Sequence, residues 1–364
     1  MTLPDAISSY EQVLFGNSPS VGLRAIVAVH STALGPALGG TRYVAYADED
    51  AALRDVLDLA RAMTYKNALA GLPHGGGKAV IIGDPHVDKT PELLLSYGRL
   101  VASMQGAYVT AADVGTYVAD MDLIATVNPW TTGRSPEHGG CGDSGDLTAV
   151  GVHHGLKAVA EHLWGTPSLA GRRVAIAGAG KVGGRLAGHV LDEGGHVLIA
   201  DVNPDALARL QTAYPGPGVE VASSADDLVE ADVDVYSPCA LGRAITPEVA
   251  ARLTAAAVCG AANNQLAEPG LVDVLAARGV LFAPDFLVNA GGVIAVGAEY
   301  AGRGRYDDGP ARARARAIGD TLLDVLRRSA TAGTTPLEAA ERLAEERIAA
   351  AEPRPAFTSP EVRG

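Results

Sequence analysis

The pattern of apolar and polar positions predicts an alternation of strands and helices in the first part of the chain. Residues 22–31 alternate as a half-buried strand does, and apolar positions recur at helical spacing from residue 48 onward. Acidic residues open that helix, as the helix dipole favours. In order, the pattern predicts strands over 22–31 and 37–46, a helix over 48–69, a strand over 78–84, a helix over 90–106 and a strand that ends on Asp113.

A second region begins after a loop rich in turn residues, 128–146. From residue 172 onward strands and helices alternate, which favours a doubly wound parallel sheet of the Rossmann type. We therefore expect an α/β protein of two domains, an N-terminal α/β domain over 1–145 and the parallel-sheet domain over 146–324. The helical stretch 325–351 is expected to pack back on the first domain.

Composition narrows the class of partner. The 364 residues carry a net charge of −13, which disfavours binding to nucleic acid or anionic membranes, so we expect a small-molecule partner. The start of the chain lacks the pattern of a secretory leader, and no long apolar run occurs, so we expect a cytoplasmic protein. Three widely spaced cysteines and scattered histidines predict neither disulfides nor a metal site.

A glycine motif in the second region has the context of a dinucleotide-binding turn. It follows a predicted strand and opens a predicted helix, and an acidic residue closes the next strand. The glycines let the backbone approach a pyrophosphate at the start of the helix. The carboxylate would accept hydrogen bonds from the ribose hydroxyls and repel a 2′-phosphate, so we expect NAD rather than NADP. No Arg or Lys follows that carboxylate until Arg209. The candidate cofactor-binding residues here are Gly178, Gly180, Lys181, Val182, Gly183 and Asp201.

Three consecutive glycines, residues 75–77, stand directly before Lys78. Such a run is tolerated where the backbone bends sharply or where another group approaches closely. A phosphate-binding P-loop would need a glycine at 72, a hydroxyl at 79 and a following helix, but the chain has Leu72, Ala79 and a predicted strand. The remaining interpretation is a turn that presents Lys78 in a cleft, with Lys66 and Asp113 nearby.

Seven segments together resemble a known family. They are HSTALGPALGGTR, ARAMTYKNALAGLPHGGGKAVIIGDP, TAADVGTYVADMD, TTGRSP, GAGKVG, CGAANNQL and VNAGGVI. The chain resembles the glutamate, leucine, phenylalanine and valine dehydrogenases from about residue 22 to 300, and the valine and leucine branch most. The resemblance implies NAD-dependent, reversible oxidative deamination of an L-amino acid to a 2-oxo acid and ammonia, in a cleft between an N-terminal substrate domain and a Rossmann-type NAD domain. It also implies a homo-oligomer.

The resemblance also implies roles for individual residues. Lys66 would pair with the substrate carboxylate, and Lys78 and Asp113 would be catalytic. Gly39 and Gly40 would line the substrate pocket. The remaining candidates are Asn263 and Asn264, either of which could face the substrate, and Thr148 and Asn289, which resemble positions near the nicotinamide.

The chemistry suits these residue types. A lysine must be neutral to act as a base, and burial together with a positively charged Lys66 nearby favours the neutral amine. Loss of hydride from Cα leaves an iminium that water attacks, with Lys78 as the base and Asp113 moving protons. Lys66 supplies a fixed cation for the substrate carboxylate.

Four apolar residues, implied by the resemblance, would surround the substrate side chain: Leu38, Ala111, Val293 and Val296. None of them could pair with a glutamate carboxylate, so we expect a branched-chain aliphatic substrate such as valine, leucine or isoleucine. Phenylalanine is the alternative substrate. Two further alternatives are a non-catalytic NAD-binding regulatory protein and an oxidoreductase of hydroxy acids, which would need a histidine base.

Overall fold

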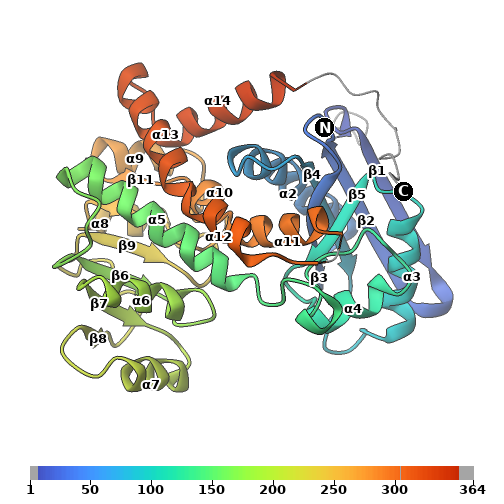
Figure 1. Ribbon diagram of the computed structural model, residues 1–364, viewed down its shortest axis with the longest axis horizontal. Coiled ribbons are helices and arrows are strands. Elements are labelled where there is room, and N and C mark those ends of the chain that lie inside the picture. The colour runs from blue at the N-terminus through green and yellow to red at the C-terminus, as the bar shows by residue number, and fades with distance from the viewer. Residues whose placement is uncertain (1–6, 304, 352–364) are drawn as a thin grey trace. The chain divides into compact units, whose positions relative to one another are not determined.

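The computed structural model describes residues 7–303 and 305–351, and the chain divides into two compact units (Figure 1). The first unit contains the residues up to Ser144, Val293–Ala311 and the residues from Ala344 onward. The second contains Gly145–Gly292 and Arg312–Leu343. Residues 1–6, on which the expectation of no leader partly rests, lie outside the described residues.

A five-stranded mixed sheet forms the centre of the first unit, in the order β1-β2-β4-β3-β5. β2 pairs antiparallel with both β1 and β4, whereas β3 pairs parallel with β4 and β5. β3 therefore lies between the central strand β4, which carries Lys78, and the edge strand β5, which Asp113 follows. The strands are β1 (Gln12–Ser18), β2 (Leu23–Ser31), β3 (Ala37–Val44), β4 (Gly75–Ile82) and β5 (Tyr108–Ala112).

Helices cover both faces of this sheet. α2 (Glu49–Leu69) packs its apolar side on one face, and Asp48 caps its start by accepting a hydrogen bond from the backbone N–H of Ala51. α3 (Pro91–Ala102) and α4 (Val118–Ala125) pack on the other face. The single-turn helices η1 (Pro19–Val21) and η2 (Pro136–His138) lie in connections.

The glycines before Lys78 lie inside β4, so the expected turn is wrong. None of the three has a positive φ. They are required by close packing instead: a Cβ atom on Gly76 would overlap with the backbone of Thr64 in α2, and one on Gly75 would overlap with the carbonyl oxygen of Ser31. The glycines thus allow α2 to approach the strand that carries Lys78.

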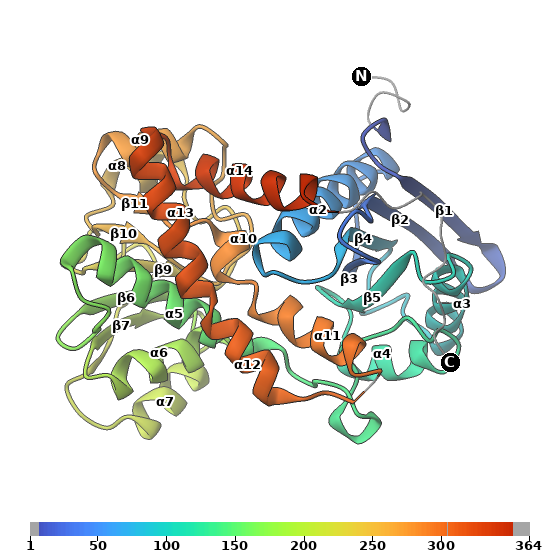
Figure 2. The same cartoon turned by 45° about the horizontal axis from the view of Figure 1, so that its top comes forward.

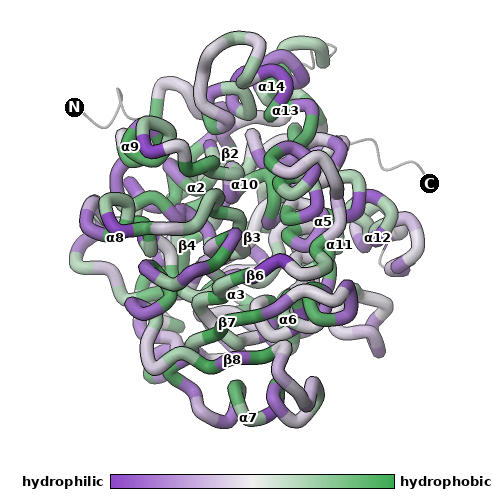
Figure 3. The backbone as a smooth tube through the Cα atoms, turned by 90° about the vertical axis from the view of Figure 1, so that its left-hand side faces the viewer, coloured by the Kyte–Doolittle hydropathy of each residue, from purple (hydrophilic) through white to green (hydrophobic). Residues whose placement is uncertain are grey.

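The second unit contains a six-stranded parallel sheet in the order β11-β10-β9-β6-β7-β8. The chain begins at the middle strand, winds outward in one direction and then in the other, as the Rossmann fold does. Figure 3 shows the apolar character of these strands, most clearly in β7. The strands are β6 (Arg173–Ala177), β7 (His196–Ala200), β8 (Val219–Val221), β9 (Val235–Pro238), β10 (Ala257–Val258) and β11 (Leu281–Phe282).

The helices of the second unit pack around this sheet. α8 and α9 share a core with the strands from β9 to β11, and α5 packs against α6 and α13. The helices are α5 (Gly145–Trp164), α6 (Gly183–Asp192), α7 (Pro204–Ala213), α8 (Pro247–Arg252), α9 (Leu271–Ala277), α10 (Asp285–Val288) and α13 (Ile318–Ala332).

Three helices follow a course that the sequence did not predict. α11 (Gly291–Ala301) belongs almost entirely to the first unit, and α12 (Asp308–Arg316) and α14 (Pro336–Ala349) contain residues of both units. Residues 293–311 therefore group with the first unit, although the sequence placed them in the second. The end of α14 packs on α2, where Tyr65 donates a hydrogen bond to Glu345 Oε1 at 3.1 Å (Figure 2).

Two further observations concern expectations from composition. In the part of the chain that the structure describes, no helix is long and apolar enough to cross a membrane. The three cysteines, Cys141, Cys239 and Cys259, are free thiols.

Candidate active site

Lys78 and Asp113 form an ion pair on the α2 face of the first sheet. Lys78 Nζ contacts Asp113 Oδ2, and Lys78 is only 7% exposed. The other carboxylate oxygen, Oδ1, accepts a hydrogen bond from the backbone N–H of Val114 at 2.7 Å. The burial expected for Lys78 is present, and its amine pairs with the Asp113 carboxylate.

Gly40 provides the space in which these two side chains meet. It lies on β3 between their strands, and a Cβ atom there would lie 2.8 Å from both Asp113 Cβ and the carbonyl oxygen of Ala112. A Cβ atom on Gly39 would overlap with the carbonyl oxygen of Gly77. Both glycines therefore serve the close packing of β3 against its neighbours.

Charge keeps Asp113 ionised. Burial raises the pKa of the Asp113 carboxyl, but the positive charges of Lys78 and Arg42 outweigh burial and bring the pKa to about 2. Asp113 is therefore a carboxylate throughout the neutral range.

Lys66 lies in the last turn of α2, and the next residue anchors that turn. The fully buried Asn67 donates hydrogen bonds from Nδ2 to the carbonyl oxygens of Leu38, at 3.1 Å, and Gly75, at 2.6 Å. Asn67 thereby ties the end of α2 to β3 and β4, the strands beside the ion pair. No pattern in the sequence singled out Asn67 for this role, although it follows Lys66 directly.

The four predicted apolar residues are all buried in the first unit. Leu38, Ala111, Val293 and Val296 are between 0% and 8% exposed. α11 supplies the two valines, and Gly297 of the same helix lies against Leu38, because a Cβ atom there would be 3.6 Å from Leu38 Cδ2. Gly133 lies beside both Val296 and Ala111 by the same measure, at 3.6 and 3.9 Å.

Glu299 of α11 is a buried carboxylate that the sequence analysis did not single out. It accepts hydrogen bonds from the backbone N–H groups of Gly133, at 2.8 Å, and Cys141, at 3.0 Å, and from Arg134 Nε at 2.9 Å. These bonds hold the loop between α4 and α5 against α11. A glutamate inside an otherwise apolar helix was the available signal.

In the second unit, the glycine motif forms the tight turn between β6 and α6. Gly178 has φ +115°, and a Cβ atom on Gly183 would overlap with the carbonyl oxygen of Gly178. A Cβ atom on Gly180, in contrast, would meet nothing within 4 Å. The turn therefore has an open side at Gly180, as the approach of a pyrophosphate requires.

Asp201 follows β7 and braces this turn. Its Oδ2 accepts a hydrogen bond from the backbone N–H of Ala179 at 2.6 Å, and its Oδ1 accepts one from the N–H of Asn203 at 2.7 Å. A cavity of about 520 Å³ begins here and continues between α6 and α7. It is lined by Ala179, Gly180, Lys181, Gly184, Arg185, Asp201, Asn203, Ala206, Arg209, Leu210, Ala213 and Tyr214.

Three basic residues share this cavity with Asp201. Arg209 was considered from the sequence, but Lys181 and Arg185 precede Asp201 and become its neighbours only in the fold. The carboxylate is thus the acidic residue in a wall whose other charged residues are all basic. Val182, the remaining residue of the motif, stands directly before α6.

The asparagines of the second unit form a cluster. Asn289 donates hydrogen bonds from Nδ2 to Asn263 Oδ1, at 2.8 Å, and to the carbonyl oxygen of Ala261, at 3.1 Å. Asn289 Oδ1 is buried without a hydrogen-bond partner among the described residues, so it can accept one from a ligand. Asn264 has a left-handed backbone, with φ 51°, and Thr148 lies in the first turns of α5.

No group of three or more His, Cys, Asp or Glu side chains is placed to hold a metal ion within residues 7–303 and 305–351.

Comparison with known proteins agrees with these features. The model of the family described as "Glu/Leu/Phe/Val dehydrogenase, dimerisation domain" matches residues 11–128, and that of "Glutamate/Leucine/Phenylalanine/Valine dehydrogenase" matches residues 199–354. A valine dehydrogenase of Streptomyces coelicolor is 54% identical over 95% of this chain and 94% of its own. A phenylalanine dehydrogenase of Caldalkalibacillus thermarum is 46% identical over 94% of this chain and 92% of its own. The crystal structure of L-tryptophan dehydrogenase from Nostoc punctiforme superposes with a TM-score of 0.82, at 37% identity, covering 95% of this chain and 98% of that one.

Proposed function

Since the chain belongs to the Glu/Leu/Phe/Val dehydrogenase family, we propose that it catalyses the NAD-dependent, reversible oxidative deamination of a branched-chain aliphatic L-amino acid. The products are the 2-oxo acid and ammonia. The observation that carries this proposal is the buried Lys78–Asp113 pair, formed by residues of the family's characteristic segments. A non-catalytic NAD-binding protein would have no need to bury this pair.

Residues of the first unit would bind the amino acid. Lys66 would pair with its α-carboxylate, a role supported by the anchoring of the α2 end through Asn67. A fixed cation orients the substrate and lowers the entropic cost of reaching the transition state.

Lys78 would act as the base and Asp113 as its partner. Lys78 in its neutral form would take a proton from the water that attacks the iminium carbon, and Asp113 would exchange protons with the departing amine. Because Asp113 already contacts Lys78, a proton could pass between them without movement of the backbone.

The glycine turn of the second unit would hold the dinucleotide. The open side of Gly180 suits a pyrophosphate, and the unpartnered Asn289 Oδ1 suits a carboxamide donor. When bound, NAD supplies the hydride acceptor. We expect NAD rather than NADP because Asp201 would accept hydrogen bonds from the ribose hydroxyls and would repel a 2′-phosphate. This expectation holds although basic residues also line the cavity.

The side-chain pocket supports the choice of substrate. Leu38, Ala111, Val293 and Val296 would surround an aliphatic side chain, and the greater identity to a valine than to a phenylalanine dehydrogenase favours the same choice. A glutamate side chain would place an unpaired charge among them. Phenylalanine is the second candidate substrate, since a phenylalanine dehydrogenase is 46% identical over 94% of this chain. Valine and leucine differ by one methylene group, which changes specificity by only about 1–3 kcal/mol, so both belong to the proposed substrate class.

A direct assay tests this function. The protein is mixed with NAD and with L-valine, L-leucine, L-isoleucine, L-phenylalanine, L-glutamate or a 2-hydroxy acid, and NADH absorbance is followed. We expect the largest kcat/KM with a branched-chain amino acid. The proposal would be contradicted if NADH formed with the hydroxy acid only, or if it formed with none of these compounds.

We also expect a homo-oligomer located in the cytoplasm. The family model over residues 11–128 is described as a dimerisation domain, which supports self-association. Light scattering coupled to size-exclusion chromatography measures the number of subunits, and fractionation of the producing cells tests the location.

A further inference from the structure

Arg42 lies beside the Oδ2 atom of Asp113, whereas the backbone N–H of Val114 bonds to the other carboxylate oxygen, Oδ1. Its Nε atom is 3.9 Å from Asp113 Oδ2, the oxygen that Lys78 also contacts. Arg42 Nε is buried and has no hydrogen-bond partner in the described part of the chain. The guanidinium thus presents an unused N–H to a carboxylate that currently pairs with Lys78.

Asp55 and Tyr46 hold the other side of the guanidinium. Arg42 Nη1 donates hydrogen bonds to Asp55 Oδ1, at 3.1 Å, and Oδ2, at 2.9 Å, and the Tyr46 hydroxyl donates one to Asp55 Oδ2 at 2.5 Å. The charges alternate along this row, from Lys78 through Asp113 and Arg42 to Asp55. These side chains are between 8% and 28% exposed, so solvent screens them only partly.

The proposed reaction disturbs this balance at one point. When Lys78 becomes neutral, Asp113 loses the positive charge that it contacts, and a buried carboxylate without a counter-ion would take up a proton. Arginine stays charged at every pH at which proteins are active. Arg42 is therefore the partner of Asp113 whose charge does not change during the reaction.

We propose that Arg42 is a positioning residue that serves as the permanent counter-ion of Asp113: it holds this carboxylate in place and favours its ionised form when Lys78 is neutral, so that a proton taken up by Asp113 is readily passed on. This inference rests on the proposed function, because it assigns Arg42 a part in the same proton transfer. Asp55 in turn holds Arg42 at the required place.

The electrostatics of the surrounding groups agree with this role. The charged side chains that act on Asp113 are Lys78 on β4 and Arg42 on β3, and Tyr108 on β5 is a further ionisable group that feels the charge of Asp113. Burial raises the pKa of Tyr108 well above its usual value and the charge of Asp113 adds to this, so Tyr108 stays neutral. Burial also raises the pKa of Tyr46, which acts on Asp113 only through Asp55 and Arg42.

The alternative is that Arg42 only ties β3 to α2 through Asp55. The two roles differ in the sign of a pH effect. Arg42→Gln removes a positive charge beside Asp113 and Lys78, so both would bind protons more tightly, and the acid limb of kcat/KM for L-valine should move up by about one pH unit. Asp55→Asn disrupts the same link between β3 and α2 but removes a negative charge, so its acid limb should stay or move down.

Two further measurements complete the test. Arg42→Lys keeps the charge, so its acid limb should remain near that of the wild type while kcat falls, because lysine cannot reproduce the forked geometry. The carboxyl signal of Asp113, assigned by its loss in Asp113→Asn, is titrated by NMR with ¹³C-labelled aspartate. Its pKa should rise in Arg42→Gln, and this readout does not need turnover.

The outcomes separate this inference from the proposed function. Wild-type protein that produces no NADH from any amino acid contradicts the function, while the carboxyl titration still tests Arg42. An active wild type with an unmoved acid limb in Arg42→Gln, or with an upward shift in Asp55→Asn, overturns the role of Arg42. Should Arg42→Gln not fold, an upward shift in Asp55→Asn, or in Arg42→Lys, would overturn it equally.

Discussion

Glu299 has no exposed surface and accepts a hydrogen bond from Arg134 Nε at 2.9 Å, so a charged pair joins α11 to the loop between α4 and α5. This pair also affects the proposed substrate pocket. Val296 precedes Glu299 by about one helical turn and lies next to Gly133, whose backbone N–H also bonds to Glu299. The carboxylate therefore holds in place the backbone beside Val296, one of the residues proposed to line the pocket.

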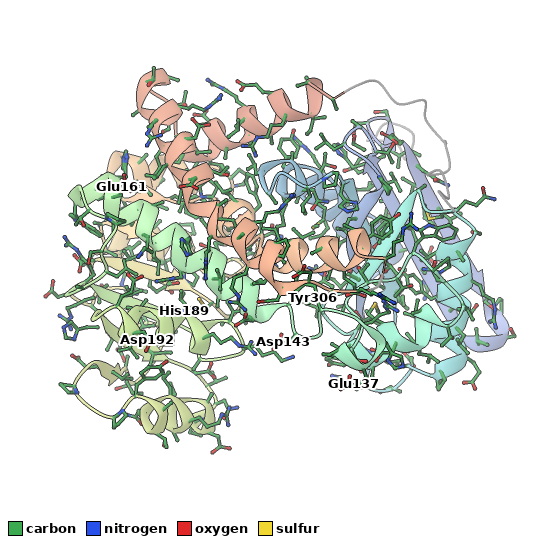
Figure 4. The ribbon with its side chains drawn as sticks, viewed as in Figure 1. Glu137, Asp143, Glu161, His189, Asp192 and Tyr306 are labelled. Atoms are coloured by element: carbon green, nitrogen blue, oxygen red, sulfur yellow. The ribbon has the colours of Figure 1, made fainter. Side chains whose placement is uncertain are left out.

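Glu299→Ala should destabilise the protein strongly. It removes one member of a buried ion pair and leaves the backbone N–H groups of Gly133, Arg134 and Cys141 without this acceptor, which costs about 3–5 kcal/mol in comparable cases. Urea unfolding measures the change. Glu161→Ala, at an exposed position of α5 labelled in Figure 4, is the control and should change the free energy of unfolding by less than about 0.5 kcal/mol. Equal effects of the two variants would show that the Glu299 contacts do not contribute.

Lys78→Ala should abolish turnover without preventing cofactor binding. Loss of a general base lowers kcat by about 10²–10⁴-fold, and NAD would still bind to the glycine turn of the second unit. NADH absorbance measures kcat, and calorimetric titration measures the affinity for NAD. Lys89→Ala, which removes an ion pair with Asp120 in the same unit, is the control and should retain most activity. Turnover near the wild-type rate in Lys78→Ala would refute the assigned role.

Asp201→Ala should weaken NAD binding and relax the discrimination against NADP. The carboxylate that would repel a 2′-phosphate is removed, while the positive charges of Lys181, Arg185 and Arg209 remain around the cavity. The ratio of kcat/KM for NADP to that for NAD is the measurement, and we expect it to rise by about tenfold or more, equivalent to about 1.4 kcal/mol. Asp205→Ala, at an exposed position on α7, should leave the ratio unchanged. An unchanged ratio in Asp201→Ala would remove the basis for the NAD assignment.

Val293→Ala should raise activity toward phenylalanine relative to valine. Val293 is 8% exposed, so its shortening enlarges a largely closed apolar space, and a change of this size is worth about 1–3 kcal/mol in specificity. The ratio of the two kcat/KM values is measured for this variant and for Val274→Ala, a matched substitution at an exposed position of α9. A ratio that rises equally in both variants, or in neither, would count against the pocket.

His153 should make the protein less stable in mild acid. Burial lowers the pKa of His153 to about 4, although Glu193 Oε1, at 3.2 Å from its Nε2, acts in the opposite direction. The unfolded chain binds a proton near pH 6.5, so the free energy of unfolding should fall as the pH decreases from about 6.5 toward 4. His153→Gln should reduce this slope in urea unfolding at several pH values. The ring of His189, labelled in Figure 4, stacks on His153, so His189→Gln is a useful comparison. An unchanged slope in His153→Gln would show that the histidine does not titrate in this way.

Local patterns were sufficient for most elements of the fold. Helical spacing located α2 and α3 to within a few residues, and alternation of strands and helices indicated the parallel sheet of the second unit. The strand β1 was missed, because residues 12–18 have intermediate and exposed positions rather than a clear apolar face. The course of α11 was also missed, since the unit to which a helix belongs depends on contacts far away in sequence.

The sequence by itself determined the family, the glycine turn with Asp201, and Lys66, Lys78 and Asp113 as candidate residues, because each lies in a short segment with a fixed order of residues. Only the tertiary structure decided that the glycines before Lys78 form a strand under α2, that Arg42 faces Asp113, and that Glu299 holds the loop beside the pocket. The physical reason is that charge pairing and close packing act through space. Residues on separate strands and helices become neighbours only when the chain has folded.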